Sequence, residues 1–194
     1  MIDIKDLYDN PISRKWEDRY NKLPEHTQKK LDEFGSRSYK EYQLKVIKRA
    51  RTLPKRGDVF FINPKENKFF VGVVVNDNVN NINGNDLYVV LILKNKVESI
   101  EEKDFDLDFN NLLIEPCIVG KEYWTRGYFY NCGVFVENLL NIDYGFYNIG
   151  GCEYLDEFGN VLNNVPKEFG TFGVSTIIGI AYKVNKELII DSSL

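Results

Sequence analysis

Acidic side chains are concentrated in one short part of the sequence. Six carboxylates stand within the eleven residues 98–108, and Lys103 is the one cation among them. The six are Glu98, Glu101, Glu102, Asp104, Asp106 and Asp108. Paired carboxylates can serve hydrolysis, but this polar stretch shows no sign of the burial that raises a carboxyl pKa. The stretch also lacks the glycine and the distant glutamate of a calcium loop. A solvated outer face, a protein-binding face and a metal or catalytic cluster remain as interpretations.

The second half of this stretch, from Asp104 to Phe109, alternates acids with large apolar residues. A strand with this period of two would place its apolar side chains on the protein and its carboxylates in solvent. Carboxylates presented in this way accelerate association with a positively charged protein. We therefore predict that the six acids form part of a partner-binding surface. Trp124, which has glycine and polar neighbours, is a further candidate that either packs inside or lines a pocket.

Soft metal ligands are scarce, since the chain has one histidine and three cysteines: His26, Cys117, Cys132 and Cys152. All four together would make a zinc site, but structural zinc sites usually bring their ligands in closely spaced pairs. The odd number of cysteines and the lack of a Cys-x-x-Cys pair favour reduced thiols in the cytoplasm. We expect neither a metal nor a cofactor.

Familiar catalytic patterns are missing from the sequence. It contains no Gly-x-x-x-x-Gly-Lys-[Ser/Thr] loop, no Gly-x-Ser-x-Gly elbow and no His-Glu-x-x-His motif. A single histidine also argues against the acid–base chemistry that this residue usually performs. We therefore predict a binding protein rather than an enzyme.

Charge is distributed unevenly along the 194 residues, whose formal net charge is -4. Residues 1–56 carry 15 Lys and Arg against 9 Asp and Glu, whereas residues 57–194 carry 10 against 20. The acidic second part would repel nucleic acid, so a nucleic-acid partner is not expected, although the cations near residue 48 leave that alternative open. The apolar runs are too short to cross a membrane, and no secretory signal is evident, which favours the cytoplasm.

Residues 1–53 have the apolar spacing of helices. Asn10-Pro11 is a typical helix start, and apolar residues then recur at helical spacing over residues 10–23. A second helix is predicted for residues 24–35 and a third, opened by a capping box, for residues 38–53. We expect these three helices to pack as an N-terminal extension on the rest of the chain.

From Gly57 onward the apolar spacing changes to that of strands. Runs at residues 59–62, 69–75 and 87–93 predict an antiparallel meander. Gly72 interrupts the second run, which indicates a bulge or a close approach of two backbones. The Asn-rich residues 77–85 predict an exposed loop between the second and third strands.

The remaining residues also favour strands. Residues 112–119 contain Pro116, which predicts an edge strand or a bulged one. Hairpins are predicted around residues 153–162 and for residues 174–190, the second turning at Asn185-Lys186. We therefore predict the α+β class, with a helical extension over residues 1–53 and a β-rich domain over residues 54–194. Its mostly antiparallel sheet is expected to be SH3-like or barrel-like.

Short aromatic and glycine motifs in the β-rich part resemble the immunity protein 26 family of bacterial polymorphic toxin systems, of the contact-dependent inhibition type. The resemblance rests on the following segments: Arg56–Ile62, Phe70–Val74, Trp124 with Gly127, and Tyr154–Asp156. It does not include the helical first third. It implies a cytoplasmic protein that binds and neutralises a cognate toxin domain, often a nuclease.

The same opening, Gly57-Asp58-Val59, is also similar to the SH3-like barrel of the MazF/PemK endoribonuclease toxins. In that family the first loop returns through a basic, Arg-Pro-rich segment, whereas Val71-Gly72-Val73 stands here without an arginine. The residues that would hold RNA phosphate are therefore missing. An endoribonuclease and a non-enzymatic ligand-binding barrel remain the alternatives to the immunity protein.

Overall fold

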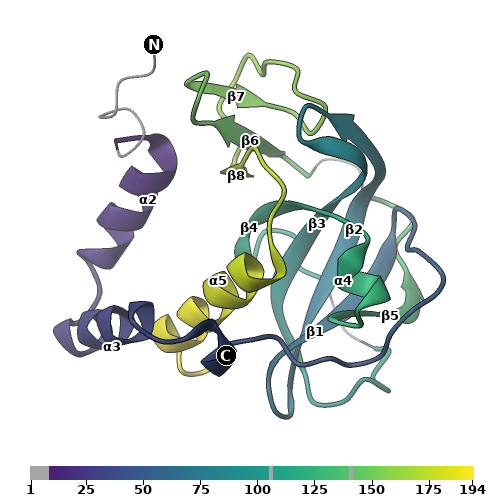
Figure 1. Ribbon diagram of the computed structural model, residues 1–194, viewed down its shortest axis with the longest axis horizontal. Coiled ribbons are helices and arrows are strands. Elements are labelled where there is room, and N and C mark those ends of the chain that lie inside the picture. The colour runs from purple at the N-terminus through teal and green to yellow at the C-terminus, as the bar shows by residue number, and fades with distance from the viewer. Residues whose placement is uncertain (1–8, 105–106, 140–141) are drawn as a thin grey trace.

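The described residues form two β-sheets and four α-helices, which is the α+β class that the sequence predicts (Figure 1). The computed structural model describes residues 9–104, 107–139 and 142–194. The helices are α2 (Pro11–Tyr20), α3 (Glu25–Gly35), α4 (Glu122–Thr125) and α5 (Ile177–Ile190), with a 3-10 turn, η1, at Tyr39–Glu41. The strands are β1 (Asp58–Lys65), β2 (Lys68–Asn81), β3 (Gly84–Val97), β4 (Leu112–Val119), β5 (Phe129–Phe135), β6 (Tyr144–Asn148), β7 (Glu153–Leu155) and β8 (Glu168–Thr171).

The larger sheet has five strands in the order β4-β3-β2-β1-β5, and every neighbouring pair is antiparallel. The predicted meander of β1, β2 and β3 is therefore confirmed. The predicted loop at residues 77–85 is wrong except at its tip, because β2 and β3 continue through it as one long hairpin. Asparagine side chains support the tip: the carboxamide oxygen of Asn81 accepts the amide of Asn83 at 2.8 Å.

Gly72 lies where β1 and β2 pair, opposite Phe60. A Cβ atom placed on Gly72 would lie 2.4 Å from a ring carbon of Phe60, well inside contact distance. This nearest neighbour is a side-chain ring, but the same Cβ would also lie 3.0 Å from the backbone oxygen of Leu91 in β3. The β2–β3 register shifts between Phe70 and Gly72, so the local irregularity predicted at this glycine is confirmed.

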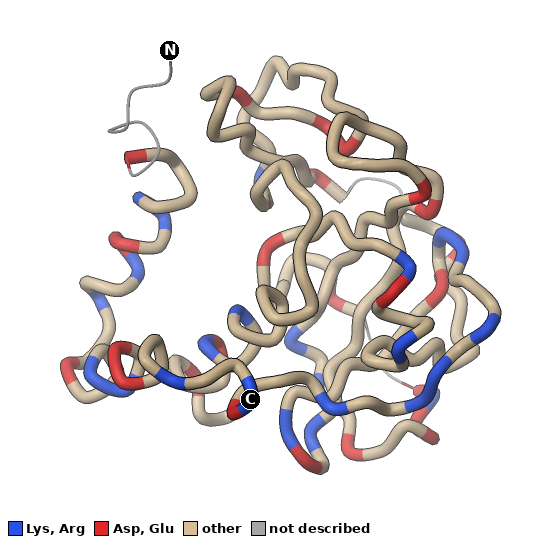
Figure 2. Tube along the Cα trace, in the orientation of Figure 1, with Lys and Arg blue, Asp and Glu red and all other residues tan. Residues whose placement is uncertain are grey.

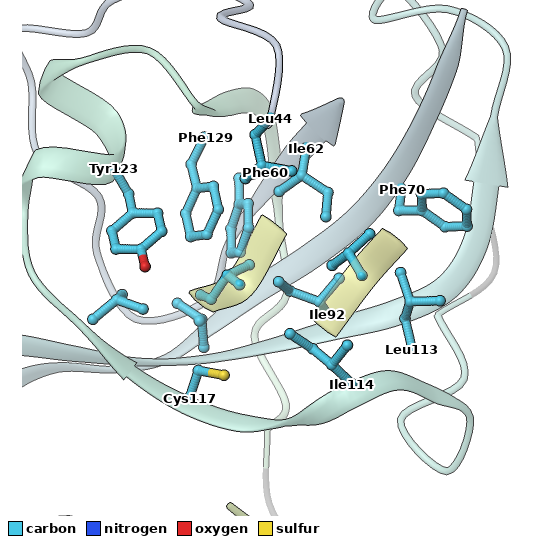
Figure 3. Close-up of a cluster of buried hydrophobic side chains, with 14 of the residues drawn as sticks. Leu44, Phe60, Ile62, Phe70, Ile92, Leu113, Ile114, Cys117, Tyr123 and Phe129 are labelled. Carbon is cyan, nitrogen blue, oxygen red and sulfur yellow. The ribbon is translucent and has the colours of Figure 1, made fainter. Parts of the chain in front are cut away.

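Both faces of the larger sheet are buried. Along β1, the side chains of Phe60 and Ile62 point into one hydrophobic cluster, and those of Val59 and Phe61 point into another. Helices α4 and α5 cover the first cluster. Figure 3 shows this cluster, in which side chains from β1 to β5 point toward one another. β6 covers the second cluster through Phe146. Burial on two faces explains why these strands are continuous apolar runs rather than alternating ones.

The sheets do not close into a barrel. The larger sheet ends at β4 on one side and at β5 on the other, and β6, β7 and β8 form a separate sheet in the order β7-β6-β8. In that sheet β6 and β8 are parallel. The predicted mostly antiparallel sheet is confirmed, but its expected SH3-like or barrel-like shape is corrected to an open sheet with a smaller sheet packed beside it.

The first two predicted helices are confirmed as α2 and α3, but the third is wrong. After the 3-10 turn, residues 43–50 have no regular secondary structure. The amides of Lys45, Ile47 and Ala50 donate to carbonyl groups of other segments at 2.7–3.0 Å, so they are not available for a helix. Val46, an apolar residue within the range of that predicted helix, is 55% exposed.

The predicted C-terminal hairpin is also wrong, because residues 177–190 form helix α5. Thr176 caps the helix by accepting the amide of Gly179 at 3.0 Å. Ile180, Ala181 and Val184, at spacings of one and three residues, lie on its buried face. The three residues have the period of a helix, but Ile180 and Val184 are β-branched and favour strands, and these residue types misled the prediction.

Two smaller predictions are confirmed. β4, which contains Pro116, is an edge strand of the larger sheet. β7 returns through a turn in which the amide of Asp156 donates to the carbonyl of Asn160 at 2.9 Å, and Leu155 then pairs antiparallel with Val161.

None of the described helices is long and apolar enough to span a membrane.

Candidate protein-binding surface

The acidic residues lie in the connection between β3 and β4, and we call its described residues, 98–104 and 107–111, the acidic loop. These residues form turns and irregular chain rather than the predicted strand. Asp108 begins the turn that ends the loop, since its carboxylate accepts the amide of Asn110 at 3.0 Å and its carbonyl accepts that of Asn111 at 3.0 Å. Phe105 and Asp106 lie outside the described residues.

Apolar side chains attach the acidic loop to the protein. Ile100, Leu107 and Phe109 are half-buried and pack against the cluster on the second face of the larger sheet. The acids point away from this cluster: Glu98, Glu101, Asp104 and Asp108 are exposed and Glu102 is half-buried. The loop is thus held by its apolar residues while its carboxylates remain in water, without the regular backbone of a strand.

No ion pair neutralises these carboxylates within the described part of the chain. Each of the four ion pairs found there joins other residues. Glu102 accepts only a long hydrogen bond, 3.4 Å, from the amide of Glu98. With Lys103 as its single cation, the acidic loop presents five described acids whose charge is free to act on an approaching molecule.

Trp124, the seventh predicted contact, lies inside the protein. Its side chain has 0% exposure and packs among the rings of Phe60, Tyr88 and Phe129, at centroid distances of 5.1–5.7 Å. Its indole N–H donates to the side-chain oxygen of Asn131 at 2.9 Å. A partner docking on this structure cannot reach the ring, so Trp124 is removed from the proposed surface and assigned to the core.

The cysteines and the histidine do not come together. Cys117 and Cys132 are buried and Cys152 is exposed, all as free thiols. Burial raises the pKa of Cys117 to about 11, so this thiol stays protonated at neutral pH. Among residues 9–104, 107–139 and 142–194, no group of three His, Cys, Asp or Glu residues is arranged to hold a metal ion.

Basic residues lie together on another segment, the chain from the 3-10 turn to β1, as Figure 2 shows. Lys45, Lys48, Arg49 and Arg51 were predicted on a helix, and the irregular chain keeps all four exposed. Lys48 lies over the ring of Tyr130 at 6.0 Å. The expectation that nucleic acid is not a partner stays a prediction.

Fold and site together define an α+β protein with a well-packed larger sheet. Its acidic loop presents carboxylates that form no ion pair among the described residues. The chain belongs to a known family of this class: the family model for Immunity protein 26 matches residues 55–151. The match includes all five strands of the larger sheet, the acidic loop and β6, and it leaves out α2, α3, β7, β8 and α5. No curated protein and no solved structure matches the chain.

Proposed function

We propose that this protein binds the catalytic domain of a cognate toxin, a nuclease, in the cytoplasm, and neutralises it without performing chemistry. Membership in an immunity protein family supports the antidote role. The observation that supports a nuclease target is the acidic loop, in which five described carboxylates have no ion-pair partner among the described residues.

A nuclease needs cations at its substrate site because it must hold phosphate groups. An inhibitor that covers this site gains most from carboxylates that are already exposed, since they need not break an internal ion pair to bind. The acidic loop meets this condition. Its half-buried anchors, Ile100, Leu107 and Phe109, fix the loop to the sheet and limit the conformational entropy lost on binding.

The proposal is tested by removing charge from the acidic loop while keeping its shape. The variant carries Glu98→Gln, Glu101→Gln and Asp104→Asn, three exposed residues that do not support a turn through a side-chain oxygen in the described structure. Association with the toxin domain encoded beside this protein is measured by stopped flow at low and high salt. We expect association to slow about tenfold or more at low salt and to differ much less at high salt.

A matched control removes three exposed carboxylates elsewhere, by Glu17→Gln, Asp18→Asn and Glu33→Gln on α2 and α3. It changes the net charge by the same amount, so a general effect of charge would slow both variants alike. Equal association rates for the loop variant and the wild type would refute the proposed surface. Cells that express the toxin and survive only with this protein would establish neutralisation separately from the identity of the surface.

A further inference from the structure

A groove of about 690 Å³ lies between α2 and the body of the protein. In Figure 1, α2 stands to one side, and α5 and β8 lie across from it. The residues that line the groove come from α2 and its N-cap, the first half of β4, the region of β6 and β8, and α5. A volume of this size is typical of binding sites.

The walls of the groove are largely apolar and aromatic. They include Ile12 and Trp16 of α2, Leu112 and Ile114 of β4, Phe169 of β8 and Tyr182 of α5. No residue of α2 is fully buried, although the helix has an apolar stripe. An amphipathic helix gains its stability from covering that stripe, and here the stripe borders an open groove.

One wall of the groove is the open edge of the larger sheet. β4 is the last strand of that sheet, and its far end is covered, because Ser175 donates its amide to the carbonyl of Ile118 at 2.7 Å. Gly170 of β8 lies against the carbonyl of Pro116. Along Leu112–Glu115, no described strand pairs with the outer edge, and it is this part that lines the groove.

Six of the seven charged side chains in the groove form three ion pairs. These are Lys15–Glu168 at 3.6 Å, Arg19–Glu187 at 2.5 Å and Lys183–Glu115 at 2.7 Å. Pairing of this kind leaves the six residues without a net charge. The groove is therefore not simply a charged patch.

The seventh charge belongs to Lys186, which has no ion-pair partner among the described residues. Its Nζ lies 3.3 Å from the centroid of the Trp16 ring. Burial lowers the pKa of Lys186, and the nearby carboxylates of Glu115 and Glu187, which raise it, do not offset this effect, because the cations Arg19 and Lys183 also lower it. An anion in the groove would stabilise the charged ammonium, because it would replace the water that burial removes.

We propose that this groove binds an extended peptide segment of a partner protein, which adds as a strand to β4 at Leu112–Glu115 and places one acidic side chain against Lys186. Four residues of a strand span about 13 Å and would use the backbone groups of the open edge. Apolar side chains of the segment lie against Trp16 and Phe169. The groove goes beyond the toxin-binding role of the acidic loop and does not depend on it.

The groove contains its own spectroscopic reporter. Trp16 lines it, whereas the only other tryptophan, Trp124, has 0% exposure. The probe is the peptide acetyl-Thr-Val-Glu-Val-Thr-Val-amide, added to the full chain, and a second peptide has glutamine in place of glutamate. We expect the acidic peptide to change the emission of Trp16 and to bind at least about fivefold more tightly than the glutamine peptide. Trp16→Phe protein, which has lost the reporter, serves as the blank.

Variants of the lysine test its role. Lys186→Met keeps an apolar side chain of similar length but removes the charge, so we expect it to bind the glutamate and glutamine peptides equally. Lys186→Arg keeps the charge and should keep the preference for the glutamate peptide. Lys29→Met, at an exposed position of α3 away from the groove, should leave the preference unchanged. An equal loss with Lys29→Met, or equal binding of both peptides to the wild type, would overturn the assignment of Lys186.

Backbone methylation tests the strand geometry. The amides of a strand form two alternating sets, which face opposite edges. One further peptide has N-methyl groups on the first set, and another has them on the second set. Only one set of amides in an added strand faces β4, so one peptide should lose binding and the other should keep it. Equal binding of both would refute strand addition. The peptide site itself would be refuted if the emission of Trp16 did not change at about 5 mM peptide. It would also be refuted if the groove bound the fatty acid laurate saturably but bound none of the peptides.

Discussion

Replacing Trp124 by alanine tests whether this residue belongs to the core rather than to a binding surface. The substitution removes a ring with 0% exposure that contacts three other aromatic rings, and it leaves the side-chain oxygen of Asn131 without its indole donor. Removing a buried tryptophan costs about 3–5 kcal/mol of the free energy of unfolding. For a chain of this length, that corresponds to a fall in melting temperature of roughly 6–20 °C.

Trp16→Ala is the matched control, because it removes the same side chain from a half-buried position. Trp16 contacts Tyr20 at 5.8 Å and lies under Lys186 at 3.3 Å. Loss of partial burial and of one cation–π contact should cost about 1–2 kcal/mol. We expect urea unfolding, followed by circular dichroism, to rank Trp124→Ala well above Trp16→Ala. Equal costs, or a stable Trp124→Ala protein that has lost toxin binding, would refute the assignment of Trp124 to the core.

Three further predictions concern packing, ionisation and activity. Gly72→Ala places a methyl group against the ring of Phe60 and should lower the free energy of unfolding by about 1–3 kcal/mol, measured by urea titration; an unchanged midpoint would contradict the close approach. Burial raises the pKa of Glu115, but the Lys183 ammonium outweighs it and holds that pKa below its ordinary value. The stability that Glu115 contributes is therefore present above its unfolded-state pKa and is lost as the pH falls through the lower folded-state pKa. In Lys183→Met, the largest opposing cause is lost and only a backbone hydrogen bond at Glu115 and the charge of Lys186 still oppose burial, so the folded-state pKa should rise. The cost of charged Glu115 should then shrink as the pH falls from 7 to 4, and a stability profile parallel to that of the wild type over this range would contradict the reasoning. Purified protein should not hydrolyse RNA, DNA or chromogenic glycosides, and turnover that disappears in Glu102→Gln would show that it is an enzyme.

Local signals in the sequence were sufficient for several elements. The Asn10 cap accepts the amides of Ile12 and Ser13 as its position before Pro11 predicts, and α2 begins there. Apolar runs predicted β1, β2 and β3 because burial on both faces makes such strands apolar throughout. Interactions between distant segments decided the elements that were missed. After residue 42, backbone amides donate hydrogen bonds to carbonyl groups of other segments instead of forming the bonds of a helix. Such tertiary hydrogen bonds override helix propensity.

The candidate site was predicted in part. The alternation of acids with apolar residues near Asp104 indicated which side chains would face water, and this holds for the described residues without a strand. The burial of Trp124 could not be read from its polar neighbours in sequence, since its contacts come from residues on three separate strands. The groove could not be predicted either, because four segments far apart in the chain form it. The domain boundary between residues 53 and 54 stays a prediction.

Helix α3 near one end of the chain packs on α5 near the other. Phe34 stacks on Tyr182 with centroids 5.1 Å apart, and Arg19 of α2 pairs with Glu187 of α5. The ribosome makes α2 and α3 long before α5, so these helices emerge without the surface that stabilises them, and short isolated helices are marginal in water. The larger sheet, whose strands lie between residues 58 and 135, can form in the meantime. The part of this protein that is synthesised early is therefore expected to be among the last to become ordered, only after α5 has been released.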